Sequence, residues 1–162
     1  MLGRYQNMSQ DAMNNPETAA SDEIPDEPVQ VLEFKLANER YCVDINTIDE
    51  IVDAGELTPV PNSEPHVEGV MDLRGRTTTI INPNTLFGNG EDGKKDRIIV
   101  LDFEGTNNDS TFGWIVDEVY QVRDVSPEMV DESATASDED VIGILRADDG
   151  FVVWVSPKIA TE

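Results

Sequence analysis

Cys42 and His66 are the sole cysteine and histidine of the chain, and together they are its best candidates for nucleophilic catalysis. An imidazole activates a thiol only when the two groups lie within hydrogen-bond reach and a third group orients the ring. Cys42 falls in an alternating, strand-like segment, whereas His66 falls in a proline-containing loop, and no pattern brings them together. We therefore expect no catalytic residue and no enzymatic activity, with Cys42 filling a strand and His66 on the surface.

Metal and cofactor sites are also not expected. A structural zinc site uses about four Cys and His ligands, and the chain has one of each. The acidic runs Asp138-Glu139-Asp140 and Asp148-Asp149-Gly150 lack the spacing of a calcium loop. Residues 88–93 (GNGEDG) lack the spacing of a phosphate-binding loop, and their acids would oppose a phosphate. The sequence therefore predicts solvated acidic loops, no metal and no cofactor.

Acidic residues dominate the chain, with 34 Asp and Glu against 11 Lys and Arg, and a formal net charge of −23. The excess is spread over the whole sequence rather than confined to one end. A surface of this sign repels phosphate backbones and anionic lipid, so we expect no nucleic-acid partner and no direct membrane insertion. An evenly acidic, lysine-poor surface is typical of a salt-rich cytoplasm, which predicts a halophilic archaeal source; an ordinary acidic protein is the alternative.

The compartment and the domain limits follow from simple features. One cysteine excludes an intrachain disulfide and fits a reducing cytoplasm. No apolar run approaches the ~18 residues that a membrane span needs, and the N-terminus lacks the regions of a signal peptide. Residues 1–28 are polar and acidic with few large apolar side chains, which predicts a disordered leader. We expect one cytoplasmic domain over residues 29–160.

The first half of the domain is predicted to contain two hairpins and a short helix. Alternating residues 32–36 and 41–45 form the first hairpin. A helix is expected over residues 47–55, because Ile48, Ile51 and Val52 recur at helical spacing and Thr47 with Glu50 matches a capping box. The prolines of residues 58–61 predict an extended edge segment.

The second hairpin is predicted within GVMDLRGRTTTII, residues 69–81, where Arg74-Gly75 separates two runs of strand-forming residues. One helical turn is expected over residues 83–87, and a polar link follows at residues 89–96. Further strands are predicted over residues 97–103, 111–122, 141–145 and 151–155, with a single turn at residues 126–128 and an acidic loop at residues 131–140.

Two halves with several short strands and a small helix each predict a mainly β fold of paired small barrels rather than one sandwich. The expected subdomains are residues 34–96 and 97–157, and the first strand, near residues 29–36, is shared between them.

Residues 29–157 resemble the CheW family, the scaffold proteins of chemotaxis signalling. The family signature V-x-G-V-x-[N/D]-L-R-G stands here as VEGVMDLRG, residues 67–75. Residues 48–51 (IDEI) and 57–61 (LTPVP) precede it in the family's order and spacing, and FGWIVDEV (112–119) and VIGI (141–144) follow it. One departure is a threonine, within residues 77–79, where the family usually has proline.

The resemblance implies two five-stranded SH3-like barrels, no catalysis and a coupling role. CheW proteins bind the regulatory domain of the histidine kinase CheA and the cytoplasmic tips of methyl-accepting chemotaxis receptors. These are therefore the expected partners, and the chain would be recruited to membrane receptor arrays through them. Its 162 residues are too few for the phosphoacceptor and ATP domains of a kinase. A generic small-barrel binding module in another signalling complex is the alternative.

Partner contacts are expected at positions that match the family's motifs: Ile48, Glu50, Gly69, Val70, Arg74, Gly75 and Gly113. Ile48 and Val70 are equally well explained as core residues. Because receptor tips are helical, an apolar groove is the expected receptor site. A strand glycine often permits close approach by another backbone, so Gly69→Asp is expected to spare the fold and weaken receptor binding.

Arg74 is a cation that a hairpin turn does not require. The resemblance implies that it pairs with Glu50, which would join the hairpin to the expected helix. Two simpler roles remain open: Arg74 as a solvated turn residue, and Glu50 as the partner of Thr47 in the capping box.

Overall fold

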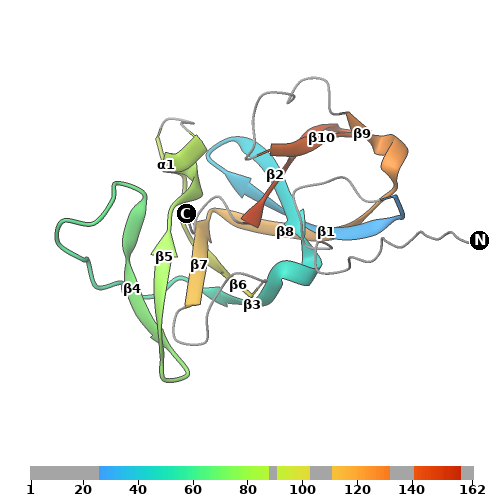
Figure 1. Cartoon of the computed structure of the whole chain (residues 1–162). Helices are drawn as coiled ribbons and strands as arrows, with labels where there is room; N and C mark the ends of the chain where they lie inside the picture. Colours follow the sequence, from blue (N-terminus) through green and yellow to red (C-terminus); the bar gives the residue numbers. More distant parts are fainter. Residues whose placement is uncertain (1–25, 88–90, 103–110, 132–140, 158–162) are drawn as a thin grey trace, which may run out of the picture.

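Strands make up most of the structure, a computed structural model that describes residues 26–87, 91–102, 111–131 and 141–157 (Figure 1). They form one sheet of five strands and one of six, which confirms the predicted mainly β fold. The predicted leader, up to residue 25, and the acidic loop from residue 132 to 140 lie outside the described residues. No helix within the described ranges is long and apolar enough to cross a bilayer.

The five-stranded sheet has the order β3-β6-β7-β5-β4. Its strands are β3 (Ile48–Asp53), β4 (Val67–Leu73), β5 (Arg76–Ile81), β6 (Arg97–Leu101) and β7 (Thr111–Val116). Helix α1 (Pro83–Phe87) follows β5 and confirms the predicted helical turn. Residues from both edge strands, Val52 on β3 and Met71 on β4, pack against one buried cluster around Ile80 and Ile98. The sheet therefore curls around this cluster as a small barrel.

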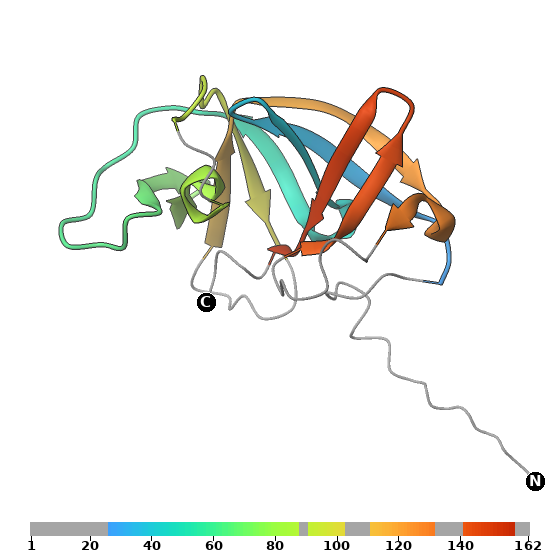
Figure 2. The same cartoon turned by 90° about the horizontal axis from the view of Figure 1, so that it is seen from above.

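The six-stranded sheet has the order β8-β1-β2-β11-β10-β9. Its strands are β1 (Val29–Leu36), β2 (Glu39–Asp44), β8 (Glu118–Val125), β9 (Val130–Asp131), β10 (Val141–Ala147) and β11 (Gly150–Val155). The predicted first hairpin is β1–β2, and the predicted single turn is the 3-10 turn Pro127–Met129. Figure 2 shows the β10–β11 hairpin at the end of the molecule away from the β4–β5 hairpin.

The main core lies between the two sheets. Phe34 and Tyr41 from the six-stranded sheet pack with Trp114 and Ile99 from the five-stranded sheet. The opposite face of β1 and β2 is also buried, where Val31 and Cys42 pack in a second cluster with Trp154. One face of β1 and β2 therefore packs against the five-stranded sheet, and the other face packs within the six-stranded sheet itself.

The helix predicted over residues 47–55 is wrong, because this segment is a 3-10 turn, Ile45–Thr47, followed by strand β3. Thr47 Oγ1 donates to the Asp44 carbonyl at 2.7 Å instead of capping a helix with Glu50. β3 pairs with β6 from Ile48 to Asp53. This pairing gives hydrogen-bond partners to the backbone groups along that edge of β6, which would lack them if residues 48–53 formed a helix. Its β-branched residues fit this pleated edge.

The strand predicted over residues 111–122 is two strands, because the chain passes from one sheet to the other at Asp117. The predicted subdomain boundary between residues 96 and 97 lies inside the five-stranded sheet, where β6 and β7 pair with β3 and β5. Pairing between residues far apart in the sequence decides which strands share a sheet, and the local pattern of residues does not reveal that pairing.

Candidate partner-binding site

The turn between β4 and β5 consists of Arg74 and Gly75, whose φ angles are 56° and 81°. Two positive φ angles are the pattern of a type I′ turn, which suits the twist of a two-residue hairpin. Glycine adopts such angles freely, whereas an arginine does so at a cost. The predicted hairpin is confirmed, and the need for a turn does not explain why an arginine stands there.

Arg74 forms an ion pair with Glu50, with Nη2 2.8 Å from Oε1. The arginine side chain is 76% exposed and the glutamate side chain 22% exposed. The predicted contact is confirmed, but it joins the hairpin to strand β3 rather than to a helix. Because β3 and β4 are the two edges of the five-stranded sheet, the pair spans the seam where the barrel closes.

A small pocket of about 50 Å³ lies beside this ion pair. Its lining combines charged groups at the rim with threonines and apolar residues: Asp49, Glu50, Leu73, Arg74, Arg76, Thr78, Val100 and Thr111. They come from all five strands of the sheet and from the β4–β5 turn. Only closure of the barrel brings them together.

Gly69 is buried, and its close neighbour is a segment of the same chain. Val70 and Thr58 exchange two backbone hydrogen bonds of 2.9 Å, and a Cβ on Gly69 would lie 2.6 Å from the Thr58 carbonyl oxygen. Gly69 also has a φ of 153°, in a region that other residues avoid. The expectation that Gly69→Asp spares the fold is therefore wrong, because the added side chain would collide with the backbone.

The other predicted contact residues divide between core and surface. Gly113 lies inside the five-stranded barrel, where a Cβ would be 2.8 Å from Ile98 Cγ2. Ile48 is partly buried against the main core. Val70 is partly exposed, and a Cβ on Gly75 would meet open space. The structure thus gathers Glu50, Arg74 and Gly75 at the hairpin end, and leaves Gly113 within the barrel.

Sequence reasoning missed the role of Asp117 at the crossing between the sheets. This buried carboxylate accepts hydrogen bonds from the backbone N–H groups of Ala37, at 2.7 Å, and Lys95, at 3.0 Å. Its own backbone N–H donates to the Lys35 carbonyl at 3.0 Å. Gly93 packs so closely that a Cβ there would collide with the carboxylate. The family motif at residues 112–119 contains this aspartate and was the available signal.

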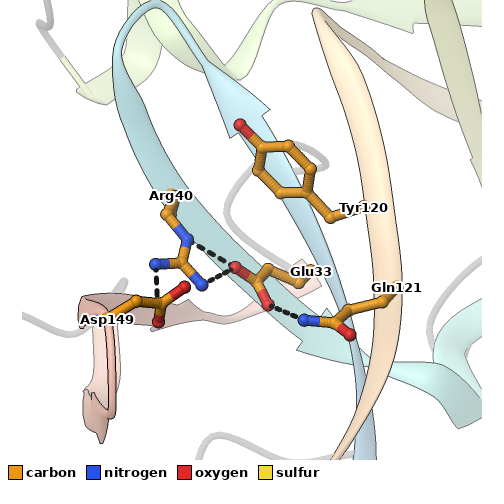
Figure 3. A pocket seen from close by; sticks show the side chains of 5 residues that line it. All are labelled: Glu33, Arg40, Tyr120, Gln121 and Asp149. Carbon is orange, nitrogen blue, oxygen red and sulfur yellow. Dashed lines mark hydrogen bonds and ion pairs between the residues drawn. The ribbon is translucent and has the colours of Figure 1, made fainter.

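A second group that sequence reasoning missed surrounds Glu33, whose side chain is 1% exposed (Figure 3). Arg40 pairs with it and reaches on to Asp149, with Nη1 and Oδ1 3.0 Å apart. Gln121 Nε2 donates to Glu33 Oε1 at 3.2 Å, and Arg123 Nη2 lies 2.9 Å from the same oxygen. Glu33, Arg40, Gln121 and Asp149, together with Tyr120, line an open pocket of about 440 Å³.

The charges around Glu33 keep it ionised. Burial raises the pKa of Glu33, but hydrogen bonds from Arg123, Arg40 and Gln121 outweigh burial and hold the pKa below its ordinary value. Each arginine reaches the carboxylate from a different strand, β2 or β8. The carboxylate therefore ties three strands of the six-stranded sheet together.

The thiol and imidazole considered for catalysis lie in different parts of the fold. Cys42 is buried in the second cluster, and burial raises the pKa of its thiol well above the ordinary value. His66 immediately precedes β4 and accepts a hydrogen bond on its carbonyl from the Asn82 backbone N–H at 2.7 Å. A buried, protonated thiol is a poor nucleophile.

Comparisons with known proteins point to one family. Residues 30–159 match the family described as CheW-like domain. Chemotaxis protein CheW of Thermotoga maritima is 26% identical over 136 residues, which cover 82% of this chain and 88% of that protein. Chemotaxis protein CheW of Treponema pallidum is 33% identical over 113 residues, covering 66% of this chain and 64% of that protein.

The solved structures agree with the sequence comparisons. The crystal structure of scaffolding protein TtCheW from Thermoanaerobacter tengcongensis matches with a TM-score of 0.71 and 28% sequence identity. The match covers 82% of this chain and 87% of that one. The likeness therefore extends over both sheets.

Proposed function

The chain belongs to the CheW family, and on this premise we propose that it is a chemotaxis coupling scaffold that links the histidine kinase CheA to chemoreceptor tips. The observation that carries the proposal is the family match over residues 30–159, which takes in both sheets. A scaffold acts by holding two partners in a defined geometry, and this role requires no reacting group. The chain accordingly works in the cytoplasm and joins membrane receptor arrays through its partners.

The hairpin end of the five-stranded sheet is the proposed partner-binding face. Glu50, Arg74 and Gly75 lie together there, and Val70 is partly exposed on the adjoining strand. Ile48 contributes from β3, where it is only partly buried. Gly69 and Gly113 support this face indirectly, because each allows close packing beneath it.

The acidic surface is the proposed adaptation to a salt-rich archaeal cytoplasm. At about 1 M salt the Debye length is about 3 Å, so charges on partners attract or repel one another only at near contact. Binding must then depend on apolar contact and short hydrogen bonds. Exposed apolar side chains are present on the six-stranded sheet, at Tyr120, Val122 and Phe151, and at Val60 in the segment between β3 and β4.

Reconstitution tests the scaffold function. Purified chain, CheA and receptor-containing membranes are mixed at molar salt, and the kinase recovered with the membranes is measured. We expect the kinase to co-sediment only when the chain is present, and the chain to bind each partner separately. Equal recovery of kinase without the chain would contradict the proposal.

A further inference from the structure

The small pocket beside the Arg74–Glu50 pair is too small for a metabolite. Its volume is about 50 Å³, and one water molecule in the liquid occupies about 30 Å³. A single side-chain end, such as a carboxylate or a carboxamide, matches this volume. Three of its lining residues, Asp49, Arg74 and Arg76, are exposed, so the pocket reaches the protein surface and a side chain from a docked protein can enter it.

Two threonine side chains in this pocket are polar groups in a buried setting. Thr111 is 7% exposed, and its Oγ1 has no hydrogen-bond partner in the part of the chain that the structure describes. Thr78 is fully buried, and its Oγ1 donates to the Arg76 carbonyl over a long 3.4 Å. A buried hydroxyl without a good partner destabilises a fold, and valine would fill the same space without that cost. Among the described residues, the Thr111 hydroxyl thus has neither a hydrogen-bond acceptor nor a hydrogen-bond donor as its partner.

The rim of the pocket adds one cation and one anion. Arg76 and Asp49 are exposed, and neither forms an ion pair within the described ranges, whereas Arg74 and Glu50 are paired with each other. Two guanidinium groups and two carboxylates leave the lining neutral overall. A neutral group that both donates and accepts hydrogen bonds suits such a lining, because an ion would be desolvated without a net counter-charge.

We propose that this pocket is a socket for the side-chain carboxamide of an asparagine or glutamine on the chemoreceptor tip. The amide oxygen accepts hydrogen bonds from Arg76 and from the Thr111 hydroxyl, and the amide NH₂ donates to Asp49. Side chains project individually from the surface of a helix, so a single one can enter a pocket of this size. The contact carries no net charge, so it persists in concentrated salt. This inference rests on the proposed coupling function.

Removing the Thr111 hydroxyl tests the socket. Thr111→Val and wild-type protein are titrated with a purified receptor-tip fragment at molar salt, with Thr85→Val as the matched control. Thr85 is exposed on α1, beyond the far end of β5 from the pocket (Figure 1). We expect Thr111→Val to bind about three- to tenfold more weakly, with a melting temperature equal to or above that of wild type, and the control to bind normally.

Arg76→Gln provides a second, independent variant. Arg76 is exposed, so this change leaves the core intact, and we expect it to weaken receptor binding by a similar factor. Wild-type affinity in both variants would overturn the socket. Failure of the wild-type protein itself to bind the receptor tip would instead overturn the proposed coupling function. Weakened binding to CheA alone, with receptor binding unchanged, would overturn the assignment to the receptor.

A double-mutant scan identifies the occupant. Thr111→Val is combined in turn with alanine substitutions of each exposed Asn, Gln, Asp and Glu of the receptor tip. We expect one Asn or Gln whose effect on affinity largely disappears in the Thr111→Val background. Coupling to an Asp or Glu would show that the occupant is a carboxylate and overturn the carboxamide. Coupling to no residue would show that the pocket holds only water.

Discussion

Arg74 and Glu50 approach each other to 2.8 Å from opposite edges of the same five-stranded sheet. The arginine stands at the tip of the β4–β5 hairpin, and the glutamate stands on β3. No backbone ladder pairs β3 with β4, so this ion pair links the two edges through side chains. It thereby sets the position of the hairpin relative to β3 and forms one wall of the small pocket.

Breaking the Arg74–Glu50 pair is expected to impair assembly more than stability. An exposed ion pair contributes about 0–1 kcal/mol, so Arg74→Ala should shift the melting temperature little. The variant should nevertheless assemble less kinase and receptor, because the hairpin is no longer held against β3. Arg74→Lys keeps the charge and should recover only part of this loss, since it lacks the planar guanidinium.

The measurement for this pair is a double-mutant cycle of Arg74→Ala and Glu50→Ala, read out as ternary assembly at molar salt. We expect the two substitutions to be non-additive. A coupling energy of zero would mean that the pair plays no part in assembly.

Gly69→Asp is expected to lower the free energy of unfolding rather than to disrupt a partner contact directly. The new Cβ would lie 2.6 Å from the Thr58 carbonyl oxygen, at a φ of 153°. Backbone strain and this collision together should cost about 3 kcal/mol or more. Urea denaturation measures the loss, with Gly55→Asp as the control, because a Cβ on Gly55 meets nothing within 4 Å. Equal denaturation midpoints for the two variants would contradict the proposed collision.

Salt is expected to stabilise the protein. The net charge of −23 creates repulsion that the compact state feels more than the unfolded chain does. Screening at about 2 M salt should therefore raise the melting temperature above its value at about 0.1 M. Thermal melts at the two concentrations make the comparison. A midpoint that is equal or higher at low salt would refute adaptation to a salt-rich cytoplasm.

Glu33→Gln is expected to destabilise the protein at neutral pH by about 2–3 kcal/mol, because Arg40 and Arg123 lose their charge-assisted hydrogen bonds to the shared carboxylate. The pKa of Glu33 lies below its ordinary value of 4.5, so its contribution is complete above that pH and is lost as the pH falls through the lowered pKa. The difference in unfolding free energy between wild type and Glu33→Gln should therefore narrow as the pH is lowered below 4.5.

Denaturant titrations across this pH range test the role of Glu33. Glu39→Gln, at the exposed start of β2, removes an equal charge without touching a buried pair and should change stability little. A stability difference between wild type and Glu33→Gln that is constant with pH would show that the carboxylate's charge is not what stabilises the sheet.

Asp117→Ala is expected to loosen the crossing between the sheets. It removes the acceptor of two backbone N–H groups, on Ala37 and Lys95, and should cost about 2–4 kcal/mol. Asp124→Ala on the following strand β8 is the control, because its carboxylate is exposed and bonds only to the Gln30 side chain among the described residues. Chemical denaturation of both variants gives the comparison, and similar stabilities would argue against a structural role for Asp117.

Local pattern in the sequence was sufficient for the elements whose partners lie close along the chain. The β1–β2 and β4–β5 hairpins, helix α1 and the turn at Pro127 were all predicted, because turn chemistry and alternation act over a few residues. The family motifs also pointed to the contact between Arg74 and Glu50. Composition alone was enough to exclude an intrachain disulfide, since one cysteine cannot pair with another.

Only the tertiary structure decided the features that depend on distant partners. Residues 48–53 have helical spacing, yet pairing with β6 makes them a strand, because the edge of β6 needs backbone partners. A glycine is needed at position 69 because the Thr58 backbone lies too close for a side chain. The Glu33 carboxylate can be buried because arginines from two other strands pair with it. Such contacts join residues far apart in sequence. The spacing of apolar residues within one segment carries no information about which strand will pair with that segment.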